Sequence, residues 1–157
     1  LLACALIAAS GAAAAQTYPN KPVRFVVAFA PGGPADIVGR LVAQKVGEQW
    51  GQQVIVENRG GAGGAIAAQA VARAPADGYT VLVTTSSLAV TPALNPNAGY
   101  DVEKDFIPVT LIASSPNLFV ASPQSGIRTL RDAIEKGKSG KLNYGTAGAG
   151  TTPHLSA

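Results

Sequence analysis

Three short stretches rich in glycine and hydroxyl side chains could bind a small anion. They are residues 31–36 (PGGPAD), the pair Ser86 and Ser87, and residues 145–152 (GTAGAGTT). Glycine lets main-chain N–H groups approach a ligand closely, and the N-terminus of a helix favours negative charge. The residue types therefore indicate capture of a small di- or tricarboxylate, without bond-breaking chemistry.

Simpler structural explanations exist for several of these residues. A corner of strand, two glycines and helix can be an ordinary tight turn, and Asp36 would favour a helix start without any ligand. Asp36 would oppose an anion bound directly there unless water or an amino group of the ligand intervened. We expect residues 60–64 (GGAGG) to permit close helix–sheet packing. We expect His154, the only histidine, to make a polar contact at a helix start, because a metal site would need partner ligands.

Motifs of common enzyme classes are present only in part. The GKS at residues 137–139 resembles the end of a phosphate-binding loop, but Asp132 occupies the position of the first glycine. Ile66 replaces the third glycine of a dinucleotide fingerprint, and Pro123 replaces the first glycine of a nucleophile elbow. We therefore predict no catalytic residue. A hydrolase or transferase stays open as an alternative and would need a nucleophile and base outside these residues.

The elements that must position these stretches alternate between strand and helix. Residues 22–30 (PVRFVVAFA) are almost continuously apolar, as in a strand covered on both faces. Residues 35–50 carry the i, i+4 stripe of a helix packed on a sheet. The expected elements that follow are a strand at 54–57, a helix at 65–74, a strand at 79–85 and a short helix reaching residue 94. This order predicts an α/β fold with a parallel sheet, whose ligands bind at the carboxyl ends of the strands.

The pattern changes after residue 100. Two extended apolar runs, 107–113 and 118–121, precede a helix expected at 129–136 and a strand expected at 141–146. A further helix start follows. We predict that residues 16–116 form a first α/β lobe and that residues 117–157 begin a second.

The N-terminal 15 residues have the composition of a secretory signal. They carry no charge and end in Ala13-Ala14-Ala15, after which polar residues begin abruptly. Small residues at this point are typical of a cleavage site, and the stretch is too short to span a membrane. We interpret Cys4 as an ordinary residue of the apolar segment, although its surroundings resemble a lipoprotein box. The mature chain would then lack cysteine, which excludes disulfides, thiolate metal sites and a cysteine nucleophile.

The charge distribution argues against nucleic acid as a partner. The chain has 12 basic and 9 acidic residues, for a net charge of +3. The basic residues are scattered, and their densest run, at 128–141, is interrupted by Asp132 and Glu135. Such a run is typical of a solvated helix face, while the mild positive balance could help to attract an anionic ligand.

Five segments together resemble the Bug-type receptors of tripartite tricarboxylate transporters. They are YPNKPVRFVVAFAPGGPADIVGR, GQQVIVENRGGAGG, DGYTVL, YDVEKDFIPV and KLNYGTAGAGTTPHL, which are distributed along residues 18–157 in the family's order and spacing. The resemblance implies a two-lobed periplasmic-binding-protein fold of type II, of which this chain would be an N-terminal fragment after a signal peptide. Gly60 departs from the family's usual proline in ENRPGAGG.

The resemblance also implies a function and a set of site residues. The chain would be a periplasmic receptor, expected to be monomeric, that passes a carboxylate to the membrane components of a transporter. It would use no cofactor and no metal. A sensor feeding a membrane signalling protein stays open, as does the identity of the carboxylate: di- or tricarboxylate, amino acid or aromatic acid. The implied ligand-binding positions are Ala30, Gly32, Gly33, Ala35, Asp36, Ser86, Ser87, Thr146, Gly148, Thr151 and His154.

Overall fold

The computed structural model describes residues 17–140 and 142–156 of the 157-residue chain. The predicted signal segment, its cleavage site and Cys4 lie outside the described residues. Among the described residues, no helix combines the length and apolarity needed to cross a membrane.

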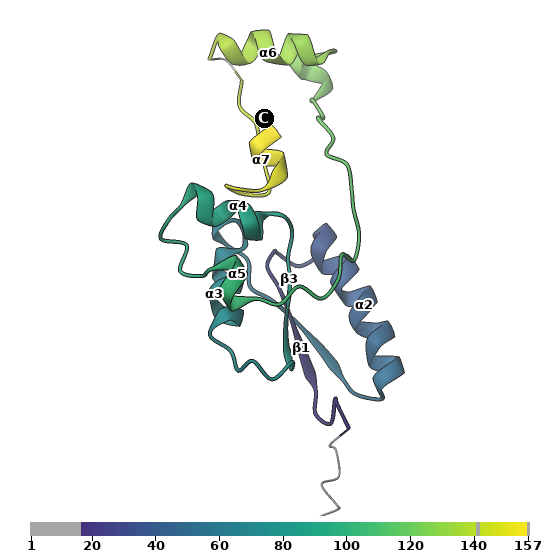
Figure 1. Cartoon of the computed structure of the whole chain (residues 1–157). Helices are drawn as coiled ribbons and strands as arrows, with labels where there is room; N and C mark the ends of the chain where they lie inside the picture. The colour runs from purple at the N-terminus through teal and green to yellow at the C-terminus, as the bar shows by residue number, and fades with distance from the viewer. Residues whose placement is uncertain (1–16, 141, 157) are drawn as a thin grey trace, which may run out of the picture.

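A three-stranded parallel sheet forms the centre of the fold (Figure 1). Its strands are β1 (Val23–Val27), β2 (Val54–Asn58) and β3 (Thr80–Val83), in the order β2-β1-β3. The register pairs Val27 with Asn58 on one side and with Val83 on the other, so all three strands end at one edge. The loops that follow the strands therefore leave the sheet close together.

Helices cover both faces of this sheet, as the apolar first strand predicts. Helix α2 (Pro34–Trp50) packs on the face where Phe25 and Val27 are buried with Ala43. Helix α3 (Ala65–Ala72) covers the opposite face, where Ala67 is buried with Val26 and Ala28. Because successive β1 side chains point to opposite faces and both faces are covered, nearly every position of β1 has to be apolar.

Short elements surround the sheet edge at which the strands end. The 3-10 turn η1 (Ala62–Gly64) leads into α3, and α4 (Ser87–Leu94) follows β3. Helix α5 (Val102–Asp105) is capped by the Asp101 carboxylate, which accepts from the main-chain N–H groups of Glu103 and Lys104. Helix α4 confirms the helix predicted after the serine pair, although Pro92 lies inside it.

The C-terminal part holds η2 (Pro123–Ser125), α6 (Leu130–Lys138) and α7 (Thr152–Ser156). Thr129 caps α6 in a capping box with Asp132, as the sequence there favours. The strand expected at 141–146 is wrong for residues 142–146, which lie in no strand. The apolar runs at 107–113 and 118–121 likewise pair with no strand among the described residues. A β-strand needs a neighbouring strand to bond its main chain, and these segments have none in this part of the chain.

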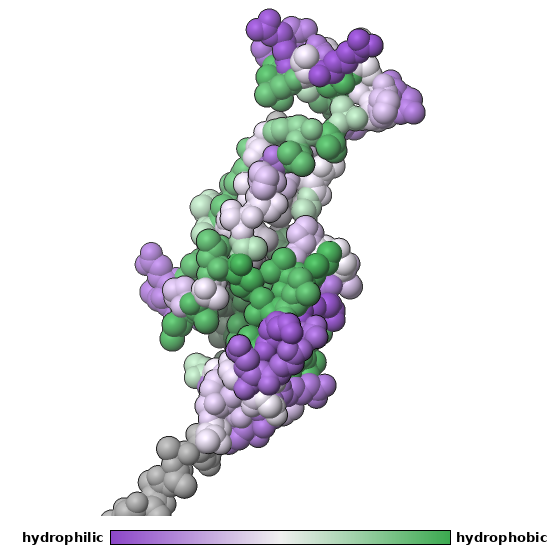
Figure 2. Space-filling model, turned by 90° about the vertical axis from the view of Figure 1, so that its right-hand side faces the viewer, coloured by the Kyte–Doolittle hydropathy of each residue, from purple (hydrophilic) through white to green (hydrophobic). Residues whose placement is uncertain are grey.

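Large apolar side chains of these segments are exposed. Ile107 is 90% exposed and Val120 is 91% exposed. The space-filling view shows hydrophobic surface across the middle of the molecule, with hydrophilic surface gathered mainly above and below it (Figure 2). The alternating exposed positions Ile107, Val109 and Leu111 have the period of a strand with one apolar face.

Candidate functional site

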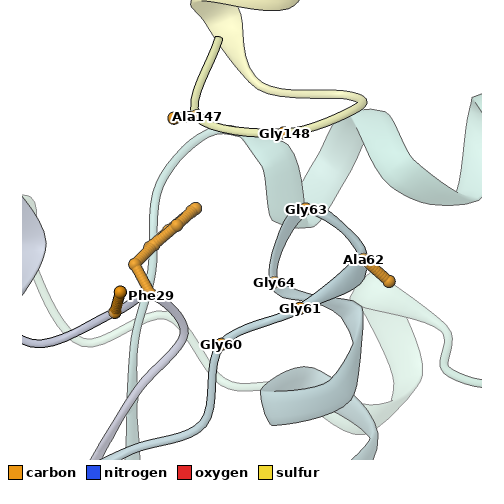
Figure 3. Close-up of a pocket in the computed structure, with 9 residues that line it drawn as sticks. Phe29, Gly60, Gly61, Ala62, Gly63, Gly64, Ala147 and Gly148 are labelled. Carbon is orange, nitrogen blue, oxygen red and sulfur yellow. The ribbon is translucent and has the colours of Figure 1, made fainter. Parts of the chain in front are cut away.

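A cavity of about 380 Å³ lies where the C-terminal segment meets the loops at the sheet edge. Three segments line it: the loop after β1, the glycine turn after β2 and the loop before α7. Figure 3 shows the Phe29 side chain extending into the space between these loops, toward Ala147. The lining residues are Phe29, Ala30, Gly60, Gly61, Ala62, Gly63, Gly64, Ala147 and Gly148.

The glycine turn and the loop before α7 touch main chain to main chain. A Cβ atom added to Gly63 would overlap the carbonyl oxygen of Ala149, and one added to Gly148 would lie 3.7 Å from the Gly63 Cα. Gly63 has φ +64°, in the left-handed region that glycine adopts most readily. Figure 3 places Gly148 directly across from Gly63. Gly63 is therefore required both by its backbone conformation and by the lack of space.

Hydroxyl groups hold the loop before α7 in place. Ser86 Oγ and Thr152 Oγ1 are 2.9 Å apart, which links the start of α4 to the start of α7. Thr151 is buried, and its hydroxyl donates to the Gly148 carbonyl at 2.6 Å. The Gly148 N–H in turn donates to Thr146 Oγ1 at 3.4 Å. These bonds fix the main chain that forms one wall of the cavity.

Asp36 anchors the loop after β1 and is not among the residues that line the cavity. It is 3% exposed and accepts from the Gly32 N–H at 2.9 Å. Arg40 Nε donates to both of its oxygens, at 2.9 and 3.0 Å, and Asn58 Nδ2 donates at 2.8 Å. The Arg40 hydrogen bonds, then those from Gly32 and Asn58, lower the pKa of Asp36 from 3.8 to about 2. The carboxylate is ionised and already fully engaged.

The other predicted site residues fall into distinct places. Ala30 and Gly148 line the cavity, whereas Gly32, Gly33 and Ala35 are not among its lining residues and lie in the loop and the first turn of α2. Ser87 is fully buried and its hydroxyl lies 3.0 Å from that of Thr85. His154 Nδ1 accepts from the Gly150 N–H at 3.4 Å, the kind of helix-start contact that the sequence suggested.

Phe29 and the turn at residues 60–64 were not among the predicted site residues, whereas Ala147 lies within the predicted stretch 145–152. Close packing explains part of that turn, since a Cβ on Gly64 would lie 3.2 Å from the Ala28 Cβ. The turn nevertheless lines the cavity as well. The available signal was its position, because a glycine run directly after a parallel strand lies at the edge where ligands bind.

The cavity wall carries no charged side chain among the described residues. A glycine-rich wall lets a ligand approach the main chain closely. The described residues also contain no group of three side chains able to hold a metal ion. The arrangement is suited to binding a small molecule, and it places no nucleophile–base pair in the cavity wall.

We expect the acid stability of the protein to depend on Asp36. Its folded pKa of about 2 lies below its ordinary 3.8, so its stabilising contribution is complete above about pH 4. That contribution is lost as the pH falls through the folded pKa. The urea midpoint should therefore fall between pH 5 and pH 2.5 more in the wild type than in Asp36→Asn, which has no charge to lose. Parallel curves for the two proteins would contradict this assignment.

Comparison with known proteins identifies the family. A sequence profile described as "Tripartite tricarboxylate transporter family receptor" matches residues 38–157. The chain belongs to this receptor family. The receptor family consists of periplasmic solute-binding proteins rather than enzymes.

Curated relatives and solved structures agree with this assignment. The protein BugT of Bordetella pertussis is 38% identical over 156 residues, which cover 95% of this chain and 48% of BugT. The structure of R. palustris Rpa4515 with adipate matches with a TM-score of 0.82 at 37% identity, over 88% of this chain and 48% of that one. MatC from Rhodopseudomonas palustris with bound malate matches with a TM-score of 0.54 at 43% identity, over 60% and 33%.

These matches confirm the α/β fold of the TctC-type periplasmic binding proteins. A further neighbour, the periplasmic binding protein BugD, is 46% identical over 54% of this chain and 28% of its own, with a TM-score of 0.52. The receptor chain described here spans about half the length of the curated relatives it matches.

Proposed function

We propose that this protein is an exported receptor that captures a small dicarboxylate and delivers it to the membrane components of a tripartite tricarboxylate transporter. The observation that carries the proposal is the glycine-walled cavity between the sheet-edge loops and the loop before α7. A ligand there would touch two parts of the chain that lie far apart in sequence, as in a clamp. The adipate and malate bound by two structural neighbours support a dicarboxylate of that size.

The proposed mechanism is capture by closure. Residues 16–116 form the first lobe and residues 117 onward begin the second, so that the Ser86–Thr152 contact joins the two lobes beside the cavity. In this proposal, main-chain N–H groups of the glycine turn and of the loop before α7 bind the carboxylates, directly or through ordered water. Contacts made only in the closed arrangement would favour closure when the ligand is present.

A thermal-shift screen of the complete protein tests this proposal. At about 100 times its Kd, a true ligand should raise the free energy of unfolding by roughly 2.7 kcal/mol, and hence the melting temperature by several degrees. The screen would use adipate, malate, citrate, an aromatic acid and an amino acid. A selective shift, with the ligand recovered unchanged, is the expected result. The absence of any shift, or consumption of the ligand, would contradict a carboxylate receptor.

A further inference from the structure

Asn58, the last residue of β2, joins the loop after β1 to the first turns of α2. Its Nδ2 donates to the Phe29 carbonyl oxygen at 3.0 Å and to Asp36 Oδ1 at 2.8 Å. Its Oδ1 accepts from Arg40 Nη2 at 2.9 Å. An amide offers two donors and one acceptor group on a short side chain, which is what these three partners require.

The two groups that accept hydrogen bonds from Asn58 Nδ2 both belong to segments connected to the cavity wall. Phe29 lines the cavity, so a bond to its carbonyl fixes the main chain from which that side chain extends. Asp36 holds the N–H of Gly32, which lies two residues beyond the cavity-lining Ala30. Asn58 itself is not among the residues that line the cavity. Its side chain can therefore affect a ligand only through the loop it holds.

We propose that Asn58 is a positioning residue of the ligand cavity, which fixes the loop of Phe29 to Gly33 in the conformation that receives the ligand. The inference deepens the proposed function and rests on it for its effect on affinity. It assigns a role in binding to β2, to which the resemblance attached no ligand-binding residue. The closeness of Asn58 Nδ2 to the Asp36 carboxylate also makes the role testable by pH.

The substitution Asn58→Asp tests the N–H donors of this side chain separately from its shape and its acceptor oxygen. It keeps the shape and the oxygen that Arg40 bonds, but it replaces the NH₂ group by a second carboxylate oxygen facing Asp36 Oδ1 and the Phe29 carbonyl. Two carboxylates at this distance raise the pKa of one of them, and the protonated form regains a donor. Lowering the pH should therefore remove the repulsion between the two carboxylates and restore one of the two donors that the substitution removes.

The charged groups around the introduced carboxyl are few. Asp36 and Arg40 face it from α2, and Glu57 and Arg59 flank it in sequence. Arg24 of β1 pairs with Glu57, and the loop at residues 29–33 carries no titratable side chain. Glu57 and Arg59 are bonded to each other, and no bond joins either of them to Asn58, Asp36 or the loop among the described contacts. The variant Glu57→Gln is thus a matched control from the same strand.

Calorimetry with adipate and with malate as probes measures the effect on affinity. In the complete protein we expect Asn58→Asp to weaken binding about 10- to 50-fold at pH 8, as for loss of hydrogen bonds to a charged partner. The ratio of variant to wild-type Kd should return to within about threefold of unity by pH 5. Because both proteins are measured with the same probe at the same pH, the effect of the probe's own protonation cancels in this ratio. A ratio independent of pH, or a loss equal to that of Glu57→Gln, would overturn the proposal.

Hydrogen exchange of the ligand-free protein supplies a second readout that needs no ligand. The N–H of Gly32 should exchange at least about 10-fold faster in Asn58→Asp at pH 8, while the amides of α3 keep their wild-type rates. Unchanged exchange at Gly32 would overturn the positioning role. If neither probe binds the wild type, the proposed cargo fails, and the exchange rates still decide whether Asn58 fixes the loop.

Discussion

Replacing Gly63 with alanine should weaken carboxylate binding by about 10- to 100-fold while leaving the fold intact. The added Cβ would overlap the Ala149 carbonyl oxygen, so the loop before α7 would have to move away from the glycine turn. Overpacking of this kind costs about 1–3 kcal/mol. If this cost destabilises the ligand-bound arrangement, it corresponds to the expected 10- to 100-fold loss of affinity. Isothermal titration of the complete protein with its best ligand from the thermal-shift screen would measure the effect.

The control for this substitution is Gly51→Ala. Gly51 caps the C-terminus of α2 with φ +62°, so both variants place a Cβ on a left-handed residue at nearly equal backbone cost. A Cβ on Gly51, however, meets nothing within 4 Å. Gly51→Ala should lower the melting temperature through its backbone cost alone and keep the affinity of the wild type. Equal affinities for the two variants would show that the contact at Gly63 plays no part in binding.

Phe29→Ala should reduce the affinity roughly 10- to 100-fold. Figure 3 shows this side chain extending into the cavity, where it is the one large apolar side chain among the described residues of the wall. Burial of a phenylalanine side chain contributes about 1.5–3 kcal/mol, and the ring would cover the methylene groups of a dicarboxylate.

Phe29→Leu is the matched variant for this prediction, because it keeps an apolar side chain at the same place. It should lose less than about fivefold in affinity. Because Phe29 also packs against the buried cluster of Val26, Ala28 and Ala67, the melting temperature of each variant is needed beside its Kd. If the alanine variant binds as tightly as the leucine variant, the Phe29 side chain makes no contact with the ligand.

Much of the fold follows from the sequence because its local patterns are unambiguous. The apolar run of β1 requires cover on both faces, and α2 and α3 supply it. Pro34 begins α2 and Gly51 ends it, as helix-start and helix-stop residues do. The family resemblance, carried by segments along residues 18–157, is confirmed by the profile match and by the solved structures.

The strand expected at 141–146 shows where local pattern is insufficient. Residues 142–146 form no strand because no neighbouring strand is present to bond them within the described chain. Strand formation depends on contacts between distant segments, whereas the capping box that starts α6 is complete within four residues. The same difference explains why helix positions were predicted better than this strand.

The sequence by itself determined the strands of the sheet, the helices that cover it and the edge at which a ligand should bind. The tertiary structure alone decided which side chains lie there. Ser87 and Asp36 were both implied as ligand-binding positions, but one is buried against Thr85 and the other is bonded to Gly32, Arg40 and Asn58. Phe29 and Gly63 line the cavity because loops more than 30 residues apart in the chain meet at the sheet edge. The direction of a side chain and the meeting of two loops depend on packing between distant segments, which spacing along the chain does not encode.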